Sequence, residues 1–275
     1  MYPVLFHAGP IVVPSYGVMA ALGVLLALAL LLRTARLANL NPNLLWNLCI
    51  VALFAALVGS RILLLALNWT VIRTHPAWLL QLAMVHHPLL AAIGGVFALA
   101  AAIPYMRAMR LPWRPTLDAL AAPLALALAC EQFGSLLSGS GYGTETTVRW
   151  SVVYTHPLAS LWSGAPLFDP VHPVQAYAAL AFLLIAIGLV LWMPRQLRPG
   201  DAAGAALLAI AVAVYFTEFF RAPEGRGEML NGAIDGPQLA SVALIILGAS
   251  LLLDRSVAPK SDAVGPAPDA ELTHE

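Results

Sequence analysis

Seven long apolar segments constrain the fold of this chain more than any other feature of its sequence. Each is about 17–25 residues long, the length that a helix needs to cross the hydrocarbon core of a bilayer. The chain is 60% hydrophobic and only 10% charged, whereas an ordinary soluble domain has about 25% charged residues. The segments are expected at 15–33, 44–67, 88–106, 117–137, 173–194, 202–220 and 237–253. We therefore predict an all-α polytopic membrane protein with seven transmembrane helices.

The basic residues between the segments predict the orientation of the chain. Nine of them follow the first, third, fifth and seventh segments: Arg33, Arg36, Arg107, Arg110, Arg114, Arg195, Arg198, Arg255 and Lys260. Four lie on or near the other side: Arg73, Arg149, Arg221 and Arg226. Because cytoplasmic loops carry the excess of Arg and Lys, the N-terminus is expected outside and the C-terminus in the cytoplasm. Residues 1–254 would form the membrane domain, and the Pro-, Ala- and Asp-rich residues 255–275 a disordered cytoplasmic tail.

The loop 138–172 is the longest one predicted on the outer side, where it would form a small periplasmic cap. Its residues 150–154 alternate as in a short strand. It begins with Ser138-Gly139-Ser140-Gly141-Tyr142-Gly143. Glycines at this spacing let backbone N–H groups turn toward an anionic head group. A flexible loop without a ligand is the alternative.

Glu131 and Arg61 are ionisable residues inside predicted spans. A charge at that depth costs about 2.5–3.5 kcal/mol on insertion scales and normally faces a polar cavity or a partner. Glu131 either does so or lies at the interface and reaches water. Arg61 requires an anion, which is either a lipid phosphate or a protein carboxylate such as Glu131 or Glu218.

Other polar residues leave similar alternatives open. Glu218 and Arg221 are three residues apart, so they either pair with each other or serve a site. Tyr16 is an interface anchor or a site residue. Asp118 lies at the start of the segment 117–137, where a carboxylate suits a helix N-terminus. The pair Gly94-Gly95 indicates close helix packing.

Several classes of function are disfavoured by what the sequence contains. The formal net charge of zero provides no basic face for nucleic acid. The histidines at 75, 86 and 87 show no metal-ligand spacing, so no metal is expected. Cys49 and Cys130 lie in apolar segments and are expected as buried thiols rather than a disulfide.

The order of several short motifs resembles the prolipoprotein diacylglyceryl transferase family of bacteria, from Pro3 to about Arg255. These motifs are Pro3-Val4-Leu5-Phe6, Tyr16-Gly17, Gly59-Ser60-Arg61, the block from Gly134 to Gly143, His172-Pro173-Val174-Gln175-Ala176-Tyr177, Glu218-Phe219-Phe220-Arg221-Ala222-Pro223 and Gly236-Pro237-Gln238. The resemblance implies a protein of the bacterial inner membrane. It also implies transfer of the diacylglyceryl group of phosphatidylglycerol, or a related phospholipid, to the lipobox cysteine of a preprolipoprotein. No cofactor is implied.

That reaction needs a base for a thiol whose free pKa is about 8.5, and groups that hold the departing phosphate. Glu131 and Glu218 are expected as catalytic residues. The residues expected to bind the lipid head group are Tyr16, Arg61, Gln132, Ser135, Gly139, Tyr142, Gly143, Gln175, Tyr177 and Arg221.

The chain departs from the family pattern at several of its polar positions. Where the family reads Gly-Arg-x-Gly, this chain has Glu131-Gln132-Phe133-Gly134, so the arginine that binds the head group is matched by Gln132. The family's His-Gly-Gly is matched by Ile93-Gly94-Gly95. The tyrosine and the arginine that the family has in its sixth span are matched in this chain by Ile210 and Val214. Two hypotheses follow: a divergent transferase whose remodelled site uses Glu131, or a catalytically altered relative that binds a lipid or a membrane protein partner.

Overall fold

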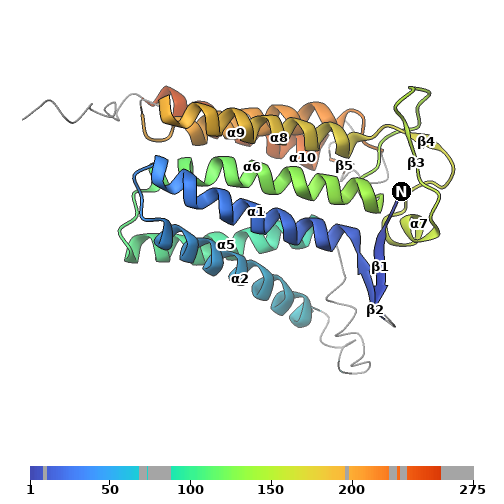
Figure 1. Cartoon of the computed structure of the whole chain (residues 1–275), viewed down its shortest axis with the longest axis horizontal. Helices are drawn as coiled ribbons and strands as arrows, with labels where there is room; N and C mark the ends of the chain where they lie inside the picture. The colour runs from blue at the N-terminus through green and yellow to red at the C-terminus, as the bar shows by residue number, and fades with distance from the viewer. Residues whose placement is uncertain are drawn as a thin grey trace, which may run out of the picture.

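The long helices of the chain run side by side in one elongated bundle, seen in a computed structural model (Figure 1). The structure describes residues 1–8, 11–67, 73, 88–195, 198–222, 228–229 and 234–254. The long helices are α1 (Ser15–Leu37), α2 (Pro42–Leu67), α5 (Pro88–Ala108), α6 (Trp113–Ser138), α8 (Val174–Trp192), α9 (Asp201–Glu218) and α10 (Gly236–Leu253). Each coincides with one of the predicted apolar segments.

Six of these helices are long and apolar enough to cross a membrane, which confirms an all-α polytopic membrane protein. For α5, the apolar stretch whose side chains the structure describes, Ile93–Ala108, is shorter than this length. The number of seven crossings and their orientation therefore stay predictions. The histidines at 75, 86 and 87 and the tail 255–275 lie outside the described residues.

Helix α6 lies at the centre of the bundle, between α1 on one side and α8 and α9 on the other (Figure 1). Glycines allow the close approach of α1 and α6. A Cβ on Gly134 would lie 2.9 Å from the Cβ of Met19, and one on Gly23 would lie 2.8 Å from that of Cys130. Such small-residue contacts are typical of packed transmembrane helices, because lipid provides no hydrophobic drive for association.

Two other helix pairs pack through glycine in the same way. Gly204 of α9 lies against the backbone of Gly248 of α10, and Gly59 of α2 lies under the ring of Phe97 on α5. The prediction of close packing is confirmed at Gly94, where a Cβ would lie 3.6 Å from that of Ala56. It is not confirmed at Gly95, where a Cβ would meet nothing within 4 Å among the described residues.

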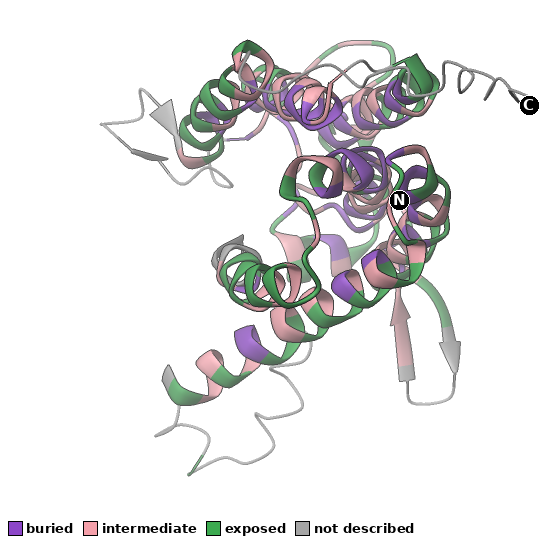
Figure 2. Cartoon of the chain, turned by 90° about the vertical axis from the view of Figure 1, so that its left-hand side faces the viewer, coloured by how far each residue is buried: buried purple, intermediate pink, exposed green. Residues whose placement is uncertain are grey.

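The apolar core lies where α6, α8 and α9 meet, and its largest side chains include Phe182, Leu189 and Ile210. Buried residues gather in the middle of the bundle, while the outer faces of the helices are exposed (Figure 2). Leu25, Phe54 and Leu184 are among the exposed apolar side chains. In a membrane protein these faces contact lipid.

The buried carboxylate of Asp118 links α6 to the start of α9 at the end of the bundle away from the predicted cap. Asp118 is 2% exposed and accepts hydrogen bonds from the backbone N–H groups of Gly200 at 2.7 Å and Ala203 at 2.8 Å. The sequence placed Asp118 at the start of its own helix. That assignment is wrong, because α6 begins earlier, at Trp113, and Asp118 instead caps α9. Arg114 and Asp254 form an ion pair at the same end.

The other end carries the smaller elements. Strands β1 (Val4–Ala8) and β2 (Ile11–Pro14) form an antiparallel hairpin ahead of α1. The loop after α6 contains β3 (Val152–Val153), α7 (Pro157–Ser163) and β4 (Pro170–Val171), which pack around Tyr154. The short strand predicted within 150–154 is thus confirmed. We call residues 138–172 the cap. The chain ahead of α10 adds a pair, β5 (Glu228–Met229) and β6 (Ile234–Asp235).

Candidate functional site

Glu131 of α6 is held by three hydrogen-bond donors. The hydroxyl of Ser135 donates to its Oε1 at 3.0 Å, and the hydroxyl of Tyr16 donates to the same oxygen at 3.3 Å. The side-chain amide of Gln132 donates to Oε2 at 2.8 Å. All three partners donate, which is the arrangement that suits an ionised carboxylate. The structure therefore brings together four of the predicted site residues, and we call this group the Glu131 cluster.

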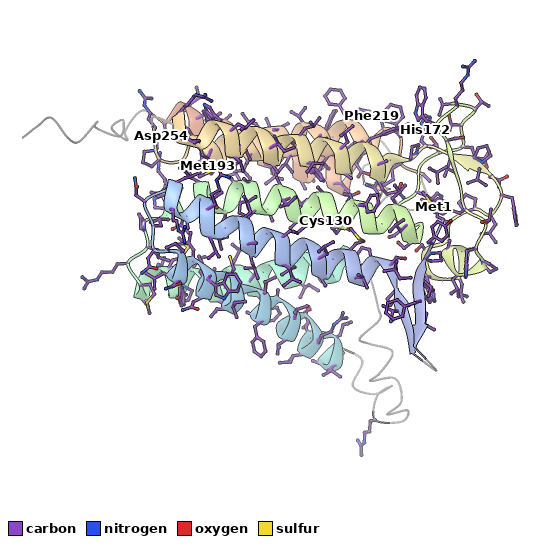
Figure 3. All side chains as sticks on the ribbon, viewed as in Figure 1. Met1, Cys130, His172, Met193, Phe219 and Asp254 are labelled. Carbon is purple, nitrogen blue, oxygen red and sulfur yellow. The ribbon has the colours of Figure 1, made fainter. Side chains whose placement is uncertain are left out.

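The position of the cluster follows from the packing of α1 on α6. Gly134 lets the first turn of α1 approach α6, which places Tyr16 beside Glu131. Glu131 lies seven residues before the end of α6 at Ser138, or about 10 Å along the axis at 1.5 Å per residue. Figure 3 labels the preceding residue, Cys130, on α6, and labels His172 and Phe219 toward the cap end. The carboxylate is half-buried at that depth.

Glu218 and Arg221 form the second predicted pair. The Nε of Arg221 lies 2.8 Å from Oε1 and 2.9 Å from Oε2 of Glu218, whose side chain is only 3% exposed. The Nη1 of Arg221 donates to the carbonyl of Gly141 at 3.0 Å. The two residues thus pair with each other, as the i, i+3 spacing allowed. They also bind the end of α9 to the loop that leaves α6.

The glycine-rich exit from α6 is shaped by these contacts. Gly139 has φ 87° and ends α6 in the left-handed conformation, which glycine adopts without strain. Gly141 has φ 64°, and a Cβ there would overlap the Arg221 guanidinium. Gly143 lies directly against His172, where a Cβ would overlap its carbonyl. The glycines therefore serve close backbone packing.

Backbone hydrogen bonds continue the link between this exit and the end of α9. The carbonyl of Tyr142 accepts from the N–H of Ala222 at 3.1 Å, and the N–H of Thr144 donates to the carbonyl of Phe220 at 2.8 Å. The ring of Tyr142 packs against the core of the cap. The cap is thereby joined to α9 as well as to α6.

Gln175 lies in the protein interior, at the base of the cap. It is 0% exposed, and its amide donates to the carbonyl of Ser140 at 2.8 Å and lies 3.5 Å from the hydroxyl of Tyr154. Tyr154 is 1% exposed and donates to the carbonyl of Leu136 at 3.2 Å. Burial raises the pKa of Tyr154 to about 12, while its hydrogen bond with Gln175 acts in the opposite direction. Neither Tyr154 nor Ser140 was singled out from the sequence.

Tyr177 belongs to an aromatic group at the cap end. Its hydroxyl accepts from Trp150 Nε1 at 2.7 Å and lies 3.4 Å from His172 Nδ1. The rings of Tyr177 and Phe220 meet edge to face with centroids 6.1 Å apart. These contacts orient the start of α8 against the cap.

Arg61 is half-buried on α2, next to the buried Gly59 and Ser60. The hydrogen bonds of Glu131 given above come from α1 and α6, and those of Glu218 come from Arg221. The alternative of a structural ion pair of Arg61 with Glu131 or Glu218 stays a prediction. A role for Arg61 toward a phosphate stays a prediction.

Two positions where the chain departs from the family pattern, Ile210 and Val214, lie in apolar surroundings. Ile210 is 8% exposed and belongs to the core between α6, α8 and α9, and Val214 packs against that core. The aliphatic side chains at these two positions provide neither the hydroxyl of a tyrosine nor the charge of an arginine. The polar groups left for a site are therefore those of the Glu131 cluster, together with Arg61 and Arg221.

The fold and this site define a multi-pass helical membrane protein with a half-buried carboxylate near one end of its bundle. The family model "Prolipoprotein diacylglyceryl transferase" matches residues 3–253. The chain belongs to the prolipoprotein diacylglyceryl transferase family.

Individual relatives are distant. The chain is 27% identical to a phosphatidylglycerol–prolipoprotein diacylglyceryl transferase of Synechococcus elongatus over 199 residues, which cover 70% of this chain and 65% of that protein. It is 27% identical to the protein of that name in Acinetobacter baumannii strain SDF over 253 residues, or 90% and 89% of the two chains. It is 25% identical to transferase 2 of Clostridium perfringens over 237 residues, or 85% and 88%.

Proposed function

We propose that this protein transfers the diacylglyceryl group of a glycerophospholipid, in the first place phosphatidylglycerol, to the thiol of a lipobox cysteine. Membership of the transferase family supports the reaction class. The observation that carries the proposal within this chain is the Glu131 carboxylate, fixed by Tyr16, Gln132 and Ser135. A carboxylate oriented in this way at the head-group end of a bundle is suited to accept a proton. We place the reaction at the outer face of the bacterial inner membrane.

In the proposed reaction, Glu131 accepts the proton of the cysteine thiol. The thiolate sulfur attacks the glycerol carbon that bears the phosphate, and a C–S bond forms as the C–O bond breaks. The electron pair of that bond leaves with the phosphate as glycerol-1-phosphate when phosphatidylglycerol is the donor. The product is a thioether, and the proton on Glu131 returns to solvent or to the departing phosphate.

The departing phosphate needs positive charge or hydrogen-bond donors. Glu218 offsets the charge of Arg221, and Gly141 takes a further donor of that guanidinium. We assign Arg61 to the phosphate because it is a half-buried arginine of α2 within a predicted span, where a cation needs an anion, and we assign Glu218 and Arg221 to holding the cap in register with the bundle. This assignment gives Glu218 an indirect role in the reaction.

Reconstitution tests the proposal. The full chain would be placed in phosphatidylglycerol vesicles with a synthetic peptide that carries a lipobox cysteine. We expect the peptide to gain one diacylglyceryl group on sulfur, with one glycerol-1-phosphate released for each peptide modified. Glu131→Gln keeps the shape of the side chain and should lower the rate by about 100-fold or more, the usual range for a lost general base.

The matched control is Glu145→Gln, which removes an equal charge from an exposed residue of the cap and should leave the rate unchanged. A Glu131→Gln protein that modifies the peptide at the full rate would contradict the role of Glu131. A wild-type protein that modifies no peptide would contradict the transferase proposal.

A second candidate is a relative that binds a lipid or a membrane protein without transferring a group. The observation that favours it is the apolar packing of Ile210 and Val214, which removes two polar positions of the family pattern. In the same vesicle experiment, this candidate predicts bound phospholipid with no peptide modification and no released glycerol-1-phosphate.

A further inference from the structure

The side-chain carbonyl of Gln132 is a buried hydrogen-bond acceptor without a donor. Its Oε1 is inaccessible to solvent and has no hydrogen-bond partner among the described residues. A buried polar atom of this kind costs about 1–3 kcal/mol when it stays unpaired, so native structures seldom leave one. An unpaired acceptor beside a half-buried carboxylate indicates that a ligand supplies the missing donor.

The orientation of this amide is fixed by its neighbour. The amide nitrogen of Gln132 lies 2.8 Å from Oε2 of Glu131. If the amide were turned over, its oxygen would lie at that distance from a carboxylate oxygen, and two acceptors would repel each other. The nitrogen is therefore committed to Glu131, and the oxygen is the atom that Gln132 can offer to a ligand.

The charge of the cluster points in the same direction. Glu131 contributes a carboxylate, and its hydrogen-bond donors described above, Tyr16, Gln132 and Ser135, are all neutral. A phosphate placed directly against these oxygens would be repelled, whereas a hydroxyl or an ammonium group would be attracted. The part of the lipid that reaches Gln132 is then a hydrogen-bond donor.

We propose that Gln132 determines lipid specificity by selecting a phospholipid whose head group ends in a hydrogen-bond donor. The inference deepens the proposed function and depends on its lipid site. Two kinds of head group share this chemistry: a glycerol, which donates through hydroxyl groups, and an ethanolamine, which donates through an ammonium group. A choline head group carries the same positive charge as ethanolamine but has no N–H or O–H donor, and the site discriminates against it.

The test measures lipid binding without any acceptor peptide, so it is independent of turnover. Short-chain phosphatidylglycerol, phosphatidylethanolamine and phosphatidylcholine would each be added to the full chain in detergent micelles, with binding measured by native mass spectrometry. We expect one or both of the first two lipids to bind about fivefold or more tightly than phosphatidylcholine, since that is the smallest factor to which the loss of a hydrogen bond to a buried acceptor corresponds. Preference for phosphatidylglycerol identifies a hydroxyl donor, and preference for phosphatidylethanolamine identifies an ammonium.

Gln132→Met separates this role from support of Glu131. Methionine has a similar length but no acceptor, so the preference over phosphatidylcholine should fall to within about twofold. If Gln132 only held Glu131 in place, the variant would change binding of all three lipids by the same factor and keep their ratio. The matched control, Phe133→Met, alters an exposed neighbour on the same helix and should keep the wild-type ratio.

Equal binding of the three lipids by the wild-type protein would overturn the proposal, and so would an unchanged ratio in Gln132→Met. An inactive protein that shows the expected ratio would contradict only the transferase function. An active protein without the ratio would contradict only the role of Gln132.

Discussion

At the scale of single residues, the chain keeps several glycines of its family pattern and changes the charges. Gly134 and Gly139 occupy positions where a Cβ would approach a neighbouring side chain or backbone closely. Glu131 and Gln132, by contrast, replace a glycine and an arginine of the pattern. The backbone path at the cap end is therefore retained while the charges at positions 131 and 132 differ from the pattern, which is why the proposed function gives Glu131 a new role.

Gly141 provides a test of the packing of the exit from α6. Gly141→Ala should destabilise the protein by about 1–3 kcal/mol, because alanine is strained at φ 64° and its Cβ would displace the Arg221 guanidinium. The free energy of unfolding can be measured in mixed detergent micelles. Gly188→Ala is the matched control, since a Cβ on that helical glycine of α8 meets no described residue within 4 Å. It should leave stability unchanged or raise it by up to about 1 kcal/mol.

The raised pKa of Tyr154 predicts that the stability of the cap depends on pH. Its pKa is raised to about 12 in the folded protein, against about 10 in an unfolded chain. The folded state holds this proton more tightly, so the stabilisation is fully present below pH 10 and is lost as pH rises from 10 to 12. In a difference titration of tyrosine absorbance, wild type minus Tyr154→Phe should show one phenol titrating near pH 12. Titration of that phenol near pH 10 would contradict its burial.

At the scale of elements, α6 organises both ends of the molecule. Near its start, Asp118 caps α9; near its end, Glu131 meets α1, and Ser140 just beyond meets Gln175 of α8. The helices were predictable from the sequence, because apolar segments of membrane-spanning length have few alternatives in lipid. These side-chain contacts were not, since residues such as Asp118 and Gly200 are 82 positions apart and nothing local indicates their pairing.

The Asp118 cap can be tested on its own. Asp118→Ala should cost about 2 kcal/mol or more of unfolding free energy, because it leaves the N–H groups of Gly200 and Ala203 without their charged acceptor. The exposed carboxylate of Asp169 in the cap is the matched control, and Asp169→Ala should change stability by less than about 0.5 kcal/mol. Similar losses for both variants would contradict the assignment.

At the scale of the whole molecule, the orientation in the membrane stays a prediction. The structure adds which connections lie together at one end of the bundle. The connections between α1 and α2, α5 and α6, and α8 and α9 lie at the end of the bundle away from the cap (Figure 1). These connections, with the chain after α10, carry the larger group of basic residues. A reporter enzyme fused after Lys260 should therefore behave as cytoplasmic. Activity of a periplasmic reporter at that site would contradict the orientation.

The sequence named the four residues that meet in the Glu131 cluster, but it did not predict how they are arranged. The sequence singled out Glu131 and Arg61 because charges in apolar helices are costly, and Glu218 and Arg221 because they are three residues apart. It left open which charges pair with each other. The structure pairs Arg221 with Glu218 and gives Glu131 neutral partners, a distinction that depends on how α1, α6 and α9 approach one another through small residues.

The most direct test of the central claim is the state of lipoproteins in a bacterium depleted of its own diacylglyceryl transferase. Expression of this chain should restore the diacylglyceryl group on the lipobox cysteine, detected as the corresponding mass gain in a reporter lipoprotein. Glu131→Gln should not restore it at equal protein level, and Glu145→Gln should. A reporter lipoprotein that stays unmodified with the wild-type chain inserted in the membrane, or that is fully modified with Glu131→Gln, would contradict the account.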